Sequence, residues 1–171
     1  MKDLVQIDHE ITSSIRRWGQ PQYPVWRFIA SESIYGYVVL SMPLILTGRL
    51  VWWQILLCFL TTYVLANALQ QLVKRNRPDY ERLTGYKMLL HTYSYPSGHS
   101  AMSASMAAAI ADFTNFGNDA MMWSFILVAF ALAFLIGISR VVVGVHYLAD
   151  VFFGWFLGFV IAWTYAAIFG V

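Results

Sequence analysis

The segment SRVVVGVHYLAD, residues 139–150, places an arginine, a histidine and an aspartate between two long apolar stretches. Charged and titratable side chains are costly in such surroundings, so we interpret them first as functional. His146 and Asp150 are four residues apart, which puts them on one face of a helix, where a carboxylate can orient an imidazole. Arg140 lies just before them, at the end of the preceding apolar stretch. This segment therefore predicts part of a polar site, made of a cation, a histidine and a carboxylate.

The segment YPSGHS, residues 95–100, is typical of a helix N-terminus that binds an anion. Pro96 can begin the helix, and the hydroxyl of Ser97 stands at the capping position before Gly98. The first N–H groups of a helix have no partner within it and form the positive end of its dipole. Such an end suits a phosphate group.

The segment KRNRP, residues 74–78, adds a second source of positive charge, because Arg77 and Arg140 carry forked donors that match phosphate oxygens. His99 and His146 come from different helices. If both reach the same phosphate, one of them, neutral and oriented by the aspartate, can attack phosphorus. The other, protonated, can donate a proton to the leaving oxygen. The predicted chemistry is phosphoryl transfer.

Zinc is the competing use of two histidines and an aspartate. Two arginines at the same site would repel a cation, and the sequence shows no further cluster of ligands. We therefore favour a site that binds phosphate and works with no metal and no other cofactor.

The composition places these residues in a membrane protein. The chain has 171 residues, of which 59% are hydrophobic and only 12% are charged, whereas a soluble domain has about 25% charged residues. The length fits a single domain, residues 1–171, without room for a second one. A single cysteine, Cys58, excludes an intrachain disulfide and is interpreted as a small buried apolar residue.

The N-terminal segment, residues 1–20, predicts an amphipathic helix rather than a signal peptide, since it has no continuous apolar core. Its apolar residues recur at helical spacing, at Leu4, Ile7, Ile11, Ile15 and Trp18. We expect this helix to lie in the membrane interface. A soluble helix that covers the mouth of the bundle is the alternative.

Five apolar stretches predict an all-α integral membrane bundle of about five transmembrane helices over residues 25–171. They cover approximately residues 25–47, 50–73, 97–113, 121–143 and 146–171. Pro43 is expected to kink the first stretch. With five spans, all three polar segments fall on the side of the membrane that holds the N-terminus.

Two of these stretches carry packing signals. The third is built from serine, alanine, methionine and glycine, so neighbouring helices can approach it closely, and we place it at the centre of the bundle. Gly154 and Gly158 give the fifth a GxxxG face. Packing within the chain is the favoured use of that face, and dimerisation is the alternative.

The three polar segments together resemble the signature of the type 2 phosphatidic acid phosphatase superfamily. That family includes membrane lipid phosphatases, glucose-6-phosphatase and soluble vanadium haloperoxidases. Here the signature reads Arg77-Pro78, then Pro96-Ser97-Gly98-His99, then Ser139-Arg140 followed by His146 and Asp150. The last two parts match in full, and the resemblance covers the chain from about residue 50 to its end.

The resemblance implies a role for each residue of the signature. His146 would be the nucleophile that becomes a phosphohistidine, Asp150 would orient it, and His99 would protonate the leaving group. The phosphate would be held by Arg77, Arg140, Ser97 and the backbone of Gly98.

One position departs from the family pattern. The family carries a lysine seven residues before the arginine of its first motif, and this chain has Gln70 there. Lys74 follows one helical turn later, on roughly the same face, so our hypothesis is that Lys74 or the adjacent Arg75 supplies the missing charge. The rival hypothesis is a site that works with a neutral Gln70.

The resemblance implies a phosphatase acting on a lipid phosphate monoester or diphosphate, similar to compact bacterial lipid A 1-phosphatases and undecaprenyl diphosphate phosphatases. A phosphotransferase that passes the phosphoryl group to a second lipid is the alternative. The expected partners are the lipid substrate and the bilayer, with no nucleic acid.

Basic residues crowd the side of the membrane that holds the site, and by the positive-inside rule this side is cytoplasmic. Bacterial members of the family usually place the site at the periplasm or cell exterior, which we favour, because some of these basic residues could bind anionic lipids.

Overall fold

The computed structural model describes residues 3–32, 35–78, 93–114 and 120–170, and every regular element in these ranges is helical. The predicted all-α class is therefore confirmed. The helices are α1 (Leu4–Gly19), a short 3-10 turn η1 (Gln20–Gln22), α2 (Tyr23–Glu32), α3 (Tyr35–Leu46), α4 (Trp52–Val73), α5 (Gly98–Phe113), α6 (Ala120–Val142) and α7 (Leu148–Phe169). Residues 79–92, which link the first two polar segments and include Arg82, Lys87 and His91, lie outside the described residues.

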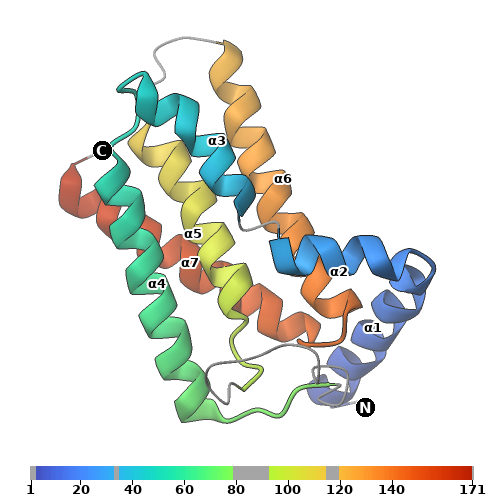
Figure 1. Ribbon diagram of the computed structural model, residues 1–171. Coiled ribbons are helices and arrows are strands. Elements are labelled where there is room, and N and C mark those ends of the chain that lie inside the picture. Colours follow the sequence, from blue (N-terminus) through green and yellow to red (C-terminus); the bar gives the residue numbers. More distant parts are fainter. Residues whose placement is uncertain (1–2, 33–34, 79–92, 115–119, 171) are drawn as a thin grey trace.

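The centre of the bundle is α5, as its small residues predict. Eleven of its sixteen residues are buried, and it contacts α4, α6 and α7 (Figure 1). Serine and alanine side chains are short, so the surrounding helices can approach the α5 backbone. Because α5 is enclosed by the other helices, its N-terminus is held at a fixed place at one end of the bundle.

The GxxxG face of α7 packs against α5 within the chain. A β-carbon on Gly154 would lie 2.6 Å from the carbonyl oxygen of Ser97, and one on Gly158 would collide with the carbonyl oxygen of Ala101. Only glycine allows this approach, so the favoured intrachain use of the motif is confirmed. The same contact fixes α7, which carries Asp150, against the start of α5.

A valine at Gly158 is therefore expected to destabilise the bundle strongly. Overpacking of a filled interior costs about 1–3 kcal/mol, and here the obstacle is rigid backbone, so the melting temperature should fall by about 6 °C or more. The measurement is thermal unfolding in detergent. Ala167→Val, an exposed position on the same helix, is the matched control and should keep the wild-type melting temperature. Equal melting temperatures for the two variants would contradict this packing.

The five predicted transmembrane stretches differ in whether their helices are long enough to cross a bilayer. Three of the described helices, α4, α6 and α7, are long and apolar enough to cross a bilayer. The sixteen-residue α5 is shorter, about 24 Å at 1.5 Å per residue, and is covered by its neighbours. The first predicted stretch is divided into α2 and α3, and the helical segment Leu4–Glu32 together with α3 could form one further span, bent by 52°. Pro43 lies within α3, so the division comes before the proline expected to cause it.

The three polar segments lie at the end of the bundle that holds the N-terminus, as predicted. The N-terminus and α1 lie at the end where α4 finishes and α5 and α7 begin, and the C-terminus lies toward the other end (Figure 1). At that other end, Leu50 and Thr114 form an isolated antiparallel bridge. Cys58 is fully buried in the core, as its interpretation required.

The α1 helix covers the mouth of the bundle and also exposes apolar side chains. Gly19 and Thr12 are buried, and Gly19 packs against Val142 of α6. Leu4 and Trp18 remain 81% and 64% exposed. The covering role of the alternative interpretation is thus present, and the exposed apolar side chains are those that the expected interfacial helix would place in lipid.

Candidate active site

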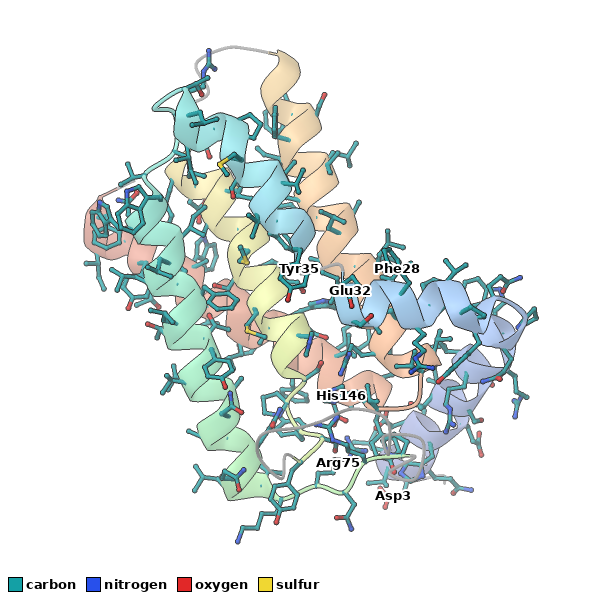
Figure 2. All side chains as sticks on the ribbon, viewed as in Figure 1. Asp3, Phe28, Glu32, Tyr35, Arg75 and His146 are labelled. Carbon is teal, nitrogen blue, oxygen red and sulfur yellow. The ribbon has the colours of Figure 1, made fainter. Side chains whose placement is uncertain are left out.

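The three polar segments meet at the α1 end of the bundle, where Figure 2 shows Arg75 and His146. Ser94 joins the first segment to the second, since its amide donates to the carbonyl of Arg75 at 2.8 Å and its hydroxyl lies 3.0 Å from the carbonyl of Asn76. The second joins the third through the amide of Ser97, which donates to the main-chain oxygen of Asp150 at 2.9 Å. Main-chain hydrogen bonds therefore fix the relative positions of all three segments.

His146 is buried and its ring is anchored through one nitrogen. Nδ1 lies 2.7 Å from the carbonyl oxygen of Ser94. A carbonyl oxygen can only accept, so Nδ1 carries the hydrogen and Nε2 keeps its lone pair in the neutral ring. Nε2 lies 3.5 Å from Nη1 of Arg77. The nitrogen that could act as a nucleophile is thus directed toward an arginine that could hold phosphate.

The surroundings of His146 keep its ring neutral. Burial lowers the pKa of His146 well below its usual range, and repulsion by Arg77 and Arg140 lowers it further, while the hydrogen bond to Ser94 acts in the opposite direction. At neutral pH the side chain therefore carries no proton on Nε2. A nucleophilic imidazole requires that protonation state.

Asp150 lies beside His146, but the predicted shared helical face is wrong, because α7 begins at Leu148 and His146 lies in the turn before it. Its Oδ2 accepts a hydrogen bond from the amide of Tyr147 at 2.9 Å and lies 3.7 Å from Nδ1 of His146. Its Oδ1 receives Nη1 of Arg75 at 2.7 Å. The imidazole thus donates its direct hydrogen bond to the carbonyl of Ser94 and not to Asp150, and the orienting role that the resemblance gives to Asp150 stays a prediction.

Sequence reasoning missed Ser94. It acts on His146 through its main-chain carbonyl, a group that every residue possesses, so no side-chain signal pointed to it. Its hydroxyl lies 3.1 Å from the carbonyl of Arg75, which holds the segment that carries this carbonyl.

Ser97 caps α5 as predicted, whereas Pro96, expected to begin the helix, lies before this cap. Ser97 is the N-cap residue, and its hydroxyl oxygen accepts from the amide of Ser100 at 3.4 Å and from the Ser100 hydroxyl at 2.9 Å. The amide of Ser97 is bonded to Asp150, so an anion would be received by the first-turn amides that begin with Gly98. His99 lies in the same turn.

Repulsion by Arg140, together with burial and repulsion by His146 and Arg77, lowers the pKa of His99 well below its usual range. The two histidines predicted to act on one phosphate are therefore close enough to influence each other. Both arginines also have fixed positions. Arg77 donates to the carbonyl of Val145 at 3.2 Å, and the buried Arg140 donates to the carbonyl of Ala30 in α2 at 2.8 Å.

Gln70 occupies the position of the missing lysine. It lies next to the start of α5, whose first-turn amides we call the phosphate cradle because they are expected to receive the phosphate. Its side chain is buried, and Nε2 donates to the carbonyl of Pro96 at 2.8 Å and would lie 3.7 Å from a β-carbon on Gly98. Lys74 is exposed at the C-cap of α4, with a left-handed φ of 53°. Arg75 pairs with carboxylates instead. The geometry therefore favours the rival hypothesis, in which a neutral Gln70 occupies this corner.

We expect Gln70→Ala to lower kcat/KM for a lipid phosphate about tenfold, because it removes a buried hydrogen bond beneath the cradle. Lys74→Ala should change kcat/KM less than twofold, because that side chain is exposed. Steady-state phosphate release by the two purified variants checks both values. The reverse order of effects would show that Lys74 supplies the charge.

Comparisons with known proteins agree with this geometry. The family model described as the PAP2 superfamily matches residues 51–170. The chain belongs to the PAP2 superfamily. The match includes all three motifs, so the resemblance to the type 2 phosphatidic acid phosphatases is confirmed at the level of the family.

Individual PAP2 proteins are similar over different shares of the chain. Phosphatidylglycerophosphatase B of Bacillus subtilis (strain 168) is 36% identical over 107 residues, which are 60% of this chain and 50% of that protein. This chain thus spans about half the length of that curated relative.

Two solved PAP2-type structures share the arrangement of helices. The transmembrane PAP2-type phosphatidylglycerolphosphate phosphatase from Bacillus subtilis superposes with a TM-score of 0.74 and 26% identity, over 99% of this chain and 88% of that one. Aquifex aeolicus LpxE superposes with a TM-score of 0.65 and 21% identity, over 92% and 93%, and at that identity shows the fold alone. The apolar helices and these membrane relatives make this chain a multi-pass membrane protein.

Proposed function

We propose that this PAP2 protein is a metal-independent phosphatase that removes the phosphate of a membrane lipid through a phosphohistidine on His146. The observation that carries the proposal is the state of His146. Its Nδ1 is anchored on the Ser94 carbonyl, its ring is held neutral, and its Nε2 is directed at Arg77 beside the start of α5.

In the first step, the lone pair of His146 Nε2 attacks phosphorus, and the bond between phosphorus and the lipid oxygen breaks. The electrons of that bond pass to the lipid oxygen, which receives a proton from His99, whose protonated form would be favoured by the negative charge of the bound phosphate. Arg77, Arg140 and the first amides of α5 would stabilise the charge on the three equatorial oxygens.

In the second step, water attacks phosphorus and gives a proton to the now neutral His99. The phosphorus–nitrogen bond breaks and its electrons return to Nε2, which leaves inorganic phosphate and the starting enzyme. If a second lipid alcohol replaces water, the same intermediate gives phosphotransfer, so analysis of the products with and without an added lipid alcohol separates these two functions.

The proposed substrate class is a phosphate monoester or diphosphate on a lipid head group. Two features support it: the site lies at one end of an apolar bundle, and the similar protein of Bacillus subtilis is named as a phosphatidylglycerophosphatase. The bilayer would hold the acyl chains while the head group reaches the start of α5.

For the membrane side, we propose a site that faces the periplasm or the cell exterior. Single cysteines test it by labelling of intact cells with an impermeant maleimide, at Ser14 near the site and at Thr47 near the other end, both exposed. Labelling at Ser14 alone is expected. Labelling at Thr47 alone would place the site in the cytoplasm, as the basic residues indicate.

The proposed activity is tested by phosphate release from a panel of lipid phosphates and diphosphates in detergent micelles, with and without EDTA. We expect release from at least one lipid, at a rate that EDTA leaves unchanged. No release from any lipid would overturn the phosphatase proposal, and loss of activity in EDTA would overturn its metal independence.

A further inference from the structure

The α1 helix caps the helix that carries Asp150. The carboxylate Oδ1 of Asp8 accepts a hydrogen bond from the amide of Ala149 at 3.0 Å, and the hydroxyl of Thr12 accepts one from the amide of Leu148 at 3.0 Å. These two amides open α7 and have no partner within that helix. Side chains of α1 therefore cap two first-turn amides of α7, next to the bond that Asp150 of α7 itself accepts from the amide of Tyr147.

The same carboxylate begins a chain of charges that leads to His146. Oδ2 of Asp8 lies 2.8 Å from Nη2 of Arg75, and Nη1 of Arg75 lies 2.7 Å from Oδ1 of Asp150. The other oxygen of Asp150 is the one 3.7 Å from the imidazole. Each arm of one guanidinium thus binds a different carboxylate, one from α1 and one from α7.

Aromatic contacts hold this guanidinium in its place. Its central carbon lies 4.0 Å from the centre of the Tyr147 ring, and His9 of α1 stacks on Tyr147 with ring centres 4.6 Å apart. Burial disfavours the charge of Arg75, yet hydrogen bonds and attraction to Asp8 and Asp150 outweigh it and raise the pKa of Arg75. The cation is therefore permanent.

We propose that Asp8 and Arg75 are positioning residues, and that α1 belongs to the active site because it contributes Asp8. Arg75 holds the carboxylate of Asp150 beside His146, and Asp8 holds Arg75. This inference rests on the proposed function, and it assigns to Arg75 a task different from the phosphate contact considered from the sequence.

The energetic reason is the burial of Asp150, whose side chain has no exposed surface. A buried carboxylate needs a cation and hydrogen bonds in fixed geometry. A lone arginine at this point could turn toward the phosphate, as Arg77 is expected to do. The second carboxylate, Asp8, binds the other arm of Arg75 and so keeps it on Asp150.

The first test compares two charge-neutralising changes on the same helix. Asp8→Asn is expected to lower kcat for the lipid phosphate about tenfold to a hundredfold with KM changed less than twofold, because displacement of a group beside the nucleophile slows chemistry more than binding. Asp3→Asn is the matched control, since Asp3 is exposed at the N-cap of α1 and makes no capping bond. It should leave both constants unchanged. Asp8→Glu, which keeps the charge, should recover part of kcat.

The second test asks whether Asp8 acts through Arg75. The effects of Asp8→Asn and Arg75→Met on kcat should be non-additive, so that the double variant is no slower than Arg75→Met alone. Thr12→Val removes the bond through which α1 caps the amide of Leu148 in α7, without changing charge, and should lower the melting temperature while kcat falls less than threefold. If Asp8→Asn does not fold, Asp8→Glu and Arg75→Lys serve instead, each with kcat between wild type and Arg75→Met.

Two results would overturn the inference while the wild type still releases phosphate: an Asp8→Asn variant as fast as Asp3→Asn, or fully additive effects of Asp8→Asn and Arg75→Met. A rise in KM without a fall in kcat for Arg75→Met would do the same, because it would make Arg75 a phosphate ligand. Failure of the proposed function itself is distinguishable, because then the wild type releases no phosphate.

Discussion

Replacement of His146 by alanine is expected to lower kcat for the lipid phosphate by about four orders of magnitude or more, since it removes the atom that attacks phosphorus. The neighbouring arginines and the start of α5 could still bind substrate, so the loss should fall on kcat rather than KM. Phosphate release in single-turnover conditions measures the residual rate.

His146→Asn separates lost chemistry from lost structure. The asparagine amide can donate to the Ser94 carbonyl, which now receives Nδ1 at 2.7 Å, but it has no counterpart of Nε2. We expect it to be as inactive as the alanine variant, with a melting temperature closer to wild type. An asparagine variant with more than about 1% of wild-type activity would show that His146 is not the nucleophile.

The second large effect is expected at His99. His99→Asn should lower kcat about a hundredfold to ten-thousandfold for a lipid phosphate, because a lipid alkoxide leaves poorly without a proton. With a nitrophenyl phosphate the loss should be less than about tenfold, because nitrophenolate needs no proton to leave. Parallel assays of wild type and variant with both substrates give the comparison.

Equal losses with the two leaving groups would contradict the role of His99 as an acid. They would indicate that the residue holds phosphate, and its electrostatic interactions with Arg77 and Arg140 would then serve binding. Ser97→Ala provides the contrast, since loss of the α5 cap should slow both substrates by a similar factor.

The parts of the site that could be predicted from the sequence are those that depend on local spacing. The closeness of His146 and Asp150, four residues apart, and the hydroxyl of Ser97 that caps α5 are properties of neighbouring residues. Small residues likewise placed α5 at the centre. Each of these predictions needed only residues that are close together in the sequence.

The expectation for Lys74 shows where local spacing is insufficient. It assumed that the second helix continues through residue 74, so that Gln70 and Lys74 share a face. In the structure α4 ends at Val73, and Lys74 has a left-handed conformation that directs the chain away. The left-handed conformation of Lys74 leaves this lysine exposed, while Gln70, within α4, lies at the start of α5.

Asp8 and Ser94 could not be found in the sequence for a different reason. Asp8 meets the start of α7 across 141 positions of the chain, and nothing near it marks it as different from Asp3. Ser94 acts through a carbonyl oxygen. Long-range contacts and main-chain groups leave no pattern in the neighbouring residues, so only the folded chain identifies them.

The most direct test of the account is the covalent intermediate. Wild type is mixed with a lipid phosphate carrying radioactive phosphorus and denatured within milliseconds in alkali, where a phosphohistidine survives. We predict label on the peptide that contains His146, its loss on mild acid treatment, and no label in His146→Asn. Label on another side chain, or turnover by wild type with no label on the protein at any time, would contradict the central claim.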